Sequence, residues 1–193
     1  MKNPAVVRTR RWTRAEYDRL IDCGVLQEDE PIELLDGLML VKEPKHTAHT
    51  TGVTLVAEAL RTAFGSGWVI RVQDPIVLDD RSEPEPDVCV VPGSPRDYRE
   101  GHPTRPALVV EVADSGLRIA RGRKARAYAR AGIADYWILN LVDRLLEVHR
   151  EPILLTEGRQ RGRYRSIVTL GPDDVVTPRA AANARIAVAD LLP

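Results

Sequence analysis

The sequence predicts an α/β protein in which helices flank a mixed β-sheet. Segments rich in β-branched residues outnumber those with helical periodicity, which indicates that a sheet lies at the centre of the fold. The predicted helices have apolar faces, and such helices cover the faces of a sheet. With 193 residues, 44% of them hydrophobic, the chain has the size of one globular domain.

Three helices are predicted. Thr13 and Glu16 have the T-x-x-E spacing of a capping box, and the helix that they begin ends near Gly24. A longer helix is expected within residues 46–65, where apolar residues recur on one face. Residues 115–131 favour a third helix, which is very basic.

The predicted strands begin with a hairpin. Residues 32–35 and 38–41 flank Asp36-Gly37, a dipeptide typical of two-residue hairpin turns. Another strand pair is expected around Asp143-Arg144. The remaining strands are expected within 68–80 (one or two strands), 86–91, 107–112, 163–170 and 184–193.

One domain is expected over residues 1–193. We expect an N-terminal extension over residues 1–11 and a core over residues 12–150. Residues 151–193 are expected to supply C-terminal strands that complete the sheet.

The overall charge and the two thiols narrow the class of protein. Lys+Arg and Asp+Glu both number 28, so the formal net charge is zero and nucleic acid would contact only a local patch. Cys23 and Cys89 lack CxxC spacing and have apolar neighbours, which predicts buried, reduced thiols and a cytoplasmic protein. We find no signal peptide and no apolar run of the roughly 20 residues that cross a bilayer, so no membrane partner is expected.

Two acids lie within strongly apolar strands. Asp87 follows Pro86 at the beginning of residues 86–91, and Glu111 lies among valines within residues 107–112. A buried carboxylate is unfavourable unless something pairs with it, so we expect partners for both. If the two strands are neighbours, the carboxylates converge at one end of the sheet. Oxygen ligands of this kind suit Mg²⁺ or Mn²⁺.

The basic helix contributes a third group. Residues 118–130 hold six basic residues and no acid, a pattern that can contact phosphates without reading bases. Lys124 is one of only four lysines among the 28 basic residues. A lysine offers a compact donor, which suits a site that activates water or neutralises an oxyanion. The candidate nucleic-acid contacts are Arg118, Arg121, Arg123 and Arg126.

Four short motifs are distinctive when they are taken together. They contain Glu33 in PIELLDGLML, Asp87 in EPDVCVV, Glu111 in LVVEVADS, and Lys124 in KARAYARAGIADYWIL. Together they resemble the Uma-two family of restriction endonucleases, a branch of the PD-(D/E)xK nuclease superfamily. The most specific parts are the I-E-L-L-D-G hairpin and the K-x-x-x-Y-x-x-x-G-I-x-x-Y-W stretch. The similarity extends from about Trp12 to Arg150.

The resemblance implies a restriction-endonuclease-like core and an endonuclease that hydrolyses DNA phosphodiester bonds with Mg²⁺ or Mn²⁺. It implies that Asp87, Glu111 and the main-chain carbonyl of Val112 bind the metal. Lys124 would orient or activate the attacking water, and Glu33 would complete the site. The family also implies a homodimer.

One departure from the superfamily concerns the lysine. Its usual position is two residues after the glutamate, where this chain has Ala113. A lysine on the following helix is what the Uma-two family itself shows, so the departure weakens the match to the superfamily more than the match to the family.

Each candidate residue also has a purely structural interpretation. Asp87 could begin a strand, Glu111 could pair with an arginine, and Lys124 and Glu33 could be surface charges. For His49 a role at the helix end is favoured over a catalytic one, and for Tyr128 core packing is favoured over a hydrogen bond at the site. The alternative function is a catalytically silent member of the fold that binds nucleic acid or protein.

Overall fold

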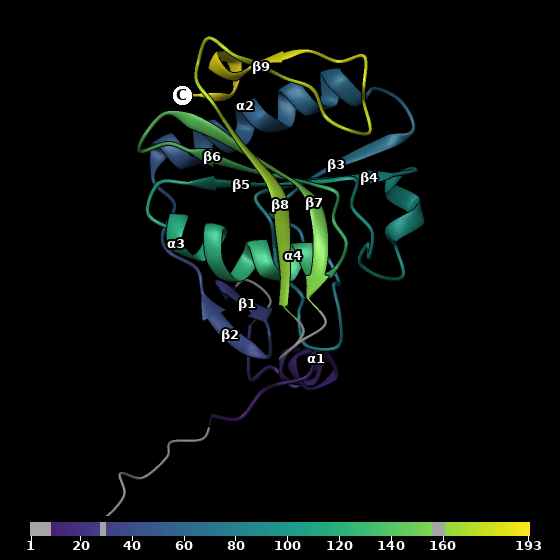
Figure 1. The fold of residues 1–193 in the computed structure, drawn as a ribbon. Helices are drawn as coiled ribbons and strands as arrows, with labels where there is room; N and C mark the ends of the chain where they lie inside the picture. Colours follow the sequence, from purple (N-terminus) through teal and green to yellow (C-terminus); the bar gives the residue numbers. More distant parts are fainter. Residues whose placement is uncertain (1–8, 28–29, 156–160) are drawn as a thin grey trace, which may run out of the picture.

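The computed structural model describes residues 9–27, 30–155 and 161–193. A six-stranded mixed sheet forms its centre. In their order across the sheet, the strands are β3 (Trp68–Val72), β4 (Val88–Pro92), β5 (Leu108–Ala113), β6 (Asp135–Asn140), β7 (Leu145–Leu155) and β8 (Arg161–Leu170). Helices flank this sheet on both faces, so the predicted α/β fold with a mixed sheet is confirmed (Figure 1).

One pair of neighbouring strands is parallel, and its connection carries the basic helix. β5 and β6 are parallel, whereas the other neighbours in the sheet are antiparallel. A parallel pair needs a long crossover, which consists of α3 (Leu117–Ile119), a π-helical turn (Ala120–Lys124) and α4 (Ala125–Arg130). The sequence favours a helix over residues 115–131 with weak points at Gly116 and Gly122, and it does not indicate the π-helical turn.

The register of β4 and β5 brings the two strand acids together. Val88 lies opposite Val110 in this antiparallel pair. Asp87 directly precedes Val88, so it lies at the same end of the sheet as Glu111. Because side chains alternate between the two faces of a strand, both acids point away from the face that carries Val88 and Val110.

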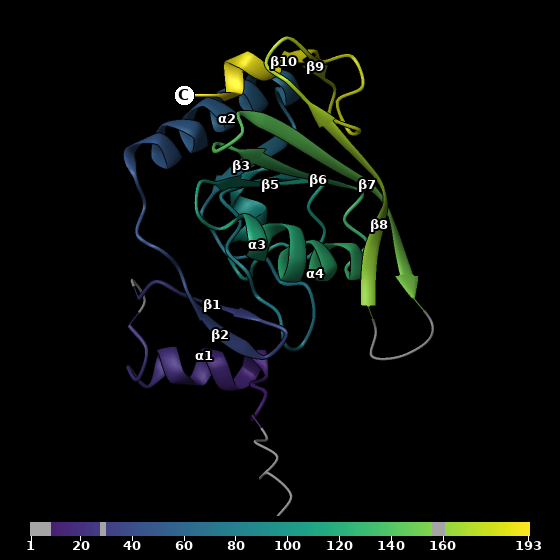
Figure 2. The same cartoon turned by 60° about the vertical axis from the view of Figure 1, so that its left-hand side comes forward.

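One face of the sheet is covered by α2 (Thr47–Phe64). Val56 and Leu60 of this helix belong to the same core as Val110 and Trp137. Three short C-terminal elements lie on the same side as α2 (Figure 2). They are β9 (Val175–Val176), β10 (Ile186–Ala187) and a 3₁₀ helix (Val188–Leu191).

The opposite face is covered by α3 and α4. Tyr128 of α4 packs with Val109 and Tyr136 in a second core. The β7–β8 hairpin extends past the sheet and lies along α4 (Figure 2). At Gly162 the approach is so close that an added Cβ would lie 2.2 Å from the backbone nitrogen of Arg130. Only glycine permits this approach of β8 to α4.

A hairpin and α1 lie beyond α4 on the far side from the sheet (Figure 1). Their bounds are α1 (Arg14–Asp22), β1 (Ile32–Leu35) and β2 (Leu38–Val41), as the capping box and the Asp-Gly turn predict. Asp36 and Gly37 have φ values of 54° and 71°, which a type I′ turn requires. Arg130 donates a hydrogen bond to Asp36 at 2.7 Å and thereby attaches the hairpin to α4.

Residues 68–80 supply one strand, β3, which agrees with the one or two strands expected there, and beyond it Asp79 and Ser82 form an isolated bridge. One expectation from the sequence is wrong. Cys23 is exposed, because it follows the last turn of α1 on the protein surface, whereas Cys89 is buried as expected. Of the expected C-terminal strands, β8 lies at the edge of the sheet, whereas β9 and β10 form a separate two-stranded pair among the described residues.

Some expectations cannot be compared in full. The expected N-terminal extension, residues 1–11, lies mostly outside the described residues. Among the described residues, no helix combines the length and apolar character that a membrane span needs.

Candidate active site

A pocket opens between the β1–β2 hairpin, the end of β5 and the π-helical turn. Its enclosed volume is about 150 Å³. The structure brings five of the predicted site residues to the lining of this one pocket. They are Glu33, Asp87, Glu111, Val112 and Lys124.

Asp87 is fixed by hydrogen bonds to both carboxylate oxygens. The backbone N–H of Val112 donates to Oδ2 at 2.8 Å. Oδ1 lies 3.2 Å from Nε2 of His49 and accepts a 3.2 Å hydrogen bond from Nε2 of Gln73. Burial by itself would raise the pKa of Asp87, but His49, the charge of Lys124 and the Val112 N–H together lower it below its usual value. Asp87 therefore stays ionised.

His49 responds to the same contact. It lies in the first turn of α2 and lines the pocket. The hydrogen bond to Asp87 raises the pKa of His49 above 6.5, although burial opposes this shift. His49 is thus a direct neighbour of the predicted metal ligand, and the helix-end role that the sequence favours is incomplete.

Gln73 adopts a conformation that its contacts with Asp87 explain. Its φ is 56°, in the left-handed region that non-glycine residues rarely occupy. The backbone N–H of Gln73 donates to the carbonyl of Asp87 at 3.1 Å, and its side chain holds the carboxylate. These two hydrogen bonds offset the backbone strain, which is typical of functional sites.

Glu111 and Lys124 form a buried ion pair. Nζ of Lys124 lies 3.0 Å from both carboxylate oxygens of Glu111. The hydroxyl of Tyr128 donates to Oε1 of Glu111 at 2.6 Å, so Tyr128 both packs in the core and holds the site. Burial raises the pKa of Glu111 to about 7, even though Lys124 opposes the shift.

Lys124 also contacts Glu33. The distance between Nζ and Oε2 of Glu33 is 3.2 Å, and the same oxygen accepts a 3.0 Å hydrogen bond from the backbone N–H of Glu85. Burial would lower the pKa of Lys124, but Glu111, Glu33 and Asp87 raise it above its usual value. A lysine in this state is protonated and acts as a hydrogen-bond donor, not as a base.

These contacts exclude surface positions for Lys124 and Glu33 and change the expected partner of Glu111. Lys124 is not a solvated helix charge, because only 7% of the residue is exposed. Glu33 is 3% exposed and is not a surface acid of the hairpin. Glu111 pairs with the lysine and not with an arginine.

The π-helical turn that ends at Lys124 is held at two points. The hydroxyl of Tyr136 donates to the carbonyl of Ala120 at 3.0 Å. Nε of Arg121 donates to both carboxylate oxygens of Glu147, at 2.9 and 3.1 Å. π-Helical turns inside helices are frequent at functional sites, and this one directs Lys124 into the pocket.

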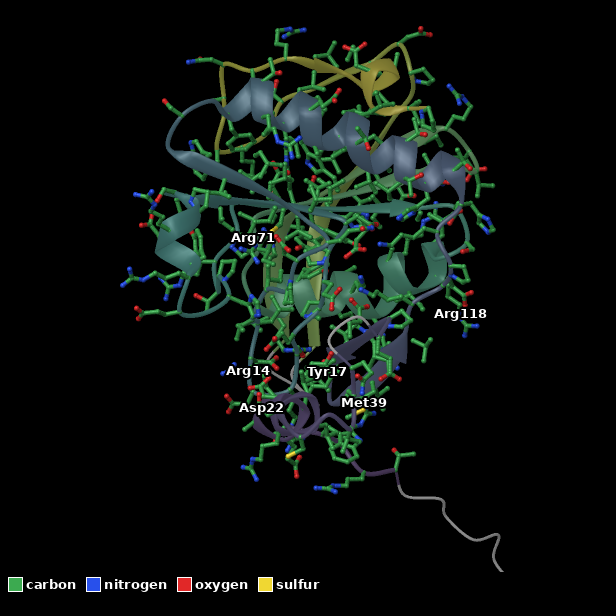
Figure 3. All side chains as sticks on the ribbon, turned by 180° about the vertical axis from the view of Figure 1, so that it is seen from behind. Arg14, Tyr17, Asp22, Met39, Arg71 and Arg118 are labelled. Atoms are coloured by element: carbon green, nitrogen blue, oxygen red, sulfur yellow. The ribbon has the colours of Figure 1, made fainter. Side chains whose placement is uncertain are left out.

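The four arginines predicted to contact nucleic acid differ in their surroundings. Arg121 is paired with Glu147, and Nη1 of Arg123 lies 3.7 Å from Asp36. Arg118 and Arg126 are exposed, and neither forms an ion pair within the part of the chain that the structure describes. Figure 3 shows Arg118 projecting outward beside α3.

The site has more negative than positive charge. Glu33 and Glu111 contact the single lysine Lys124, and Asp87 lines the same pocket beside His49. In residues 9–27, 30–155 and 161–193, no group of three or more His, Cys, Asp or Glu side chains is arranged as a complete metal site. Asp87 and Glu111 nevertheless offer the one or two carboxylates with which Mg²⁺ is usually bound alongside water and phosphate oxygens.

A mixed sheet flanked by helices, with an acid and lysine pocket at the ends of its central strands, agrees with the restriction-endonuclease-like core that the family resemblance implies. The chain belongs to the Uma2 family, described as "Putative restriction endonuclease", which matches residues 14–189. The predicted family resemblance is therefore confirmed.

A solved structure from Anabaena variabilis ATCC 29413 shares this fold. It is described as a putative nuclease belonging to DUF820. The TM-score is 0.68 at 16% sequence identity, and the alignment covers 93% of this chain and 96% of the other. No curated protein matches the chain.

The raised pKa of Glu111 predicts a pH-dependent stability. Between pH 4.5 and about 7, the unfolded chain has lost a proton that folded Glu111 keeps, so the free energy of unfolding falls as pH rises. Relative to Glu111→Gln, we expect the wild type to lose roughly 1–3 kcal/mol over this range. Urea unfolding of both proteins at several pH values measures the difference.

A matched variant controls this experiment. Glu58 is an exposed glutamate of α2, so Glu58→Gln should follow the pH profile of the wild type. If Glu111→Gln also follows that profile, Glu111 does not titrate as its burial predicts.

Proposed function

We propose that the protein is a metal-dependent endonuclease that hydrolyses DNA phosphodiester bonds. The observation that carries this proposal is the pocket in which two buried carboxylates, those of Glu33 and Glu111, contact Lys124 and which the carboxylate of Asp87 also lines. Membership of a family described as restriction endonucleases supports a hydrolase that acts on nucleic acid.

The donor set fits Mg²⁺ or Mn²⁺. Asp87 is ionised and fixed, Glu111 lines the same pocket, and the carbonyl of Val112 would supply a third oxygen. The raised pKa of Glu111 supports this fit, because a cation nearby would favour the ionised carboxylate that burial otherwise disfavours. When bound, such an ion polarises the phosphate and lowers the pKa of a water.

The residues around the proposed ion have separate roles. Protonated Lys124 donates hydrogen bonds that orient the attacking water and offset the negative charge that develops on the phosphate. Glu33 and Tyr128 position this pair, since Glu33 contacts Lys124 and Tyr128 holds Glu111. His49 and Gln73 keep the carboxylate of Asp87 directed into the pocket.

DNA would meet the protein through the basic helix. Arg118 and Arg126 are the available phosphate contacts, whereas Arg121 and Arg123 would first have to leave Glu147 and Asp36. A zero net charge makes this contact local, so we propose modest affinity outside the patch.

The other proposals concern assembly and location. A homodimer would cover an edge strand of the sheet, such as β8 with its exposed Ile167 and Val168, and light scattering measures its mass. Cys23 and Cys89 are both free thiols, which suits a reducing cytoplasm, and fractionation of cells tests this location.

A catalytically silent binding module is the second candidate. It is favoured by the neutral net charge and by the fact that Glu111 already accepts hydrogen bonds from Lys124 and Tyr128. Such a module would bind DNA or protein and would not cut DNA in the presence of any divalent metal ion.

Cleavage of DNA tests the nuclease. With Mg²⁺ or Mn²⁺ present, we expect the wild type to cut single- or double-stranded DNA and to become inactive when EDTA is added. Asp87→Asn and Lys124→Met should each lower the rate by at least about 100-fold, because each removes charge stabilisation at the reacting phosphate. Asp173→Asn changes an exposed aspartate and should leave the rate unchanged. Activity that survives both site substitutions, or no cleavage with any metal, would contradict the proposed nuclease function.

The salt dependence of DNA binding tests the basic helix. Replacing Arg118 or Arg126 with alanine should lower the slope of log K against log salt by about 1 for each phosphate that the variant no longer neutralises. Arg96 is exposed on a distant 3₁₀ helix (Pro95–Tyr98), so Arg96→Ala should keep the slope of the wild type. If Arg118→Ala and Arg126→Ala keep the slope of the wild type as the control does, α3 and α4 are not the DNA-binding surface.

A further inference from the structure

The mouth of the pocket carries two exposed branched side chains that the proposed chemistry does not use. Val41 at the end of β2 is 72% exposed, and Ile119 at the end of α3 is 45% exposed. Single exposed apolar residues are common on protein surfaces. These two are distinctive because both line the same pocket, one from the hairpin and one from the crossover helix.

Each of the two side chains has a basic neighbour in the sequence. Lys42 follows Val41, and Arg118 precedes Ile119. Lys42 is paired with Glu85, and Glu43 and Asp114 also line the pocket, so the charge around the mouth is mixed. A long duplex is held mainly by many phosphate contacts, which a mouth of mixed charge does not supply.

Two of the proposed reacting groups are almost fully buried in the pocket. Glu111 and Lys124 are only 6% and 7% exposed, and they are reached through a pocket of about 150 Å³. This volume is below the roughly 300–1,000 Å³ of sites that enclose a whole small ligand. Duplex DNA resists local bending, whereas an unpaired strand can direct one phosphodiester group inward without that deformation.

We infer that Val41 and Ile119 hold an unpaired base at the mouth, so that the substrate is a single-stranded stretch of DNA. This inference rests on the proposed function and specifies its substrate. The two apolar side chains contact the faces of the base while its phosphodiester group enters the pocket. Contacts between a base face and apolar or aromatic side chains tolerate any base, because every base has such a face. Arg118 is placed to meet a neighbouring phosphate.

Binding without cleavage tests the inference. The probe is a fluorescent oligonucleotide with 2-aminopurine at its centre, used as a single strand and as a blunt duplex, in buffer with EDTA. We expect the single strand to bind the wild type at least about tenfold more tightly than the duplex. Val41→Ser and Ile119→Ser should each weaken single-strand binding by about fivefold, because each removes apolar surface that the bound base would cover. Binding to the wild type should change the fluorescence of 2-aminopurine, and both substitutions should remove this change.

Two exposed residues away from the pocket provide matched controls. Val142 is 64% exposed and Val25 is 66% exposed, so Val142→Ser and Val25→Ser remove similar apolar surface and should bind like the wild type. Equal or tighter binding of the duplex, or normal binding by both mouth variants, overturns the inference. If the wild type cuts duplex DNA with metal, the proposed nuclease stands and only this substrate is wrong. If the wild type neither binds nor cuts any DNA, the proposed nuclease function and this inference about its substrate are both wrong.

Discussion

The arrangement of the pocket depends on one buried contact, that between Lys124 and the carboxyl group of Glu111. An ammonium group is stable inside a protein only where carboxylates surround it, and here Glu111 and Glu33 do so from two different elements. The pair therefore requires the β1–β2 hairpin, β5 and the π-helical turn to meet at one point. Removing any one of these elements would leave a buried charge without a partner, which is far more unfavourable than breaking an ion pair on the surface.

The same charges suit the cation that we propose for the pocket. Three carboxylates and one lysine leave an excess of negative charge, and burial of Glu111 keeps part of that excess neutralised by a proton at pH near 7. Asp87 is held ionised by His49, by the charge of Lys124 and by the backbone N–H of Val112. Pairs of acids whose pKa values are pushed apart in this way are typical of catalytic sites. In this protein the difference follows from the partners of each acid, a lysine and a tyrosine for Glu111 and a backbone N–H with His49 for Asp87.

Much of this arrangement is predictable from sequence because it depends on local signals. The Asp36-Gly37 turn and the Thr13 capping box define α1 and the hairpin, and an acid within a valine strand predicts a partner for Glu111. The rest depends on contacts between distant segments. Gln73 is separated from Asp87 by 14 residues, and its left-handed backbone has no signature in its neighbours. The π-helical turn likewise depends on Tyr136, which lies on the next strand. The place of Tyr128 beside the site is predictable from the sequence, because Tyr128 follows Lys124 by four residues and shares its helix face.

Binding of Mn²⁺ in the absence of DNA tests the central claim most directly, because it measures the cation site separately from cleavage. Isothermal titration near pH 7 should show one ion per wild-type chain, with release of protons as Glu111 ionises. Asp87→Asn should weaken this binding by at least about tenfold, and the exposed-site variant Asp173→Asn should not. Absence of binding to the wild type, or equal affinity in Asp87→Asn, would contradict the account.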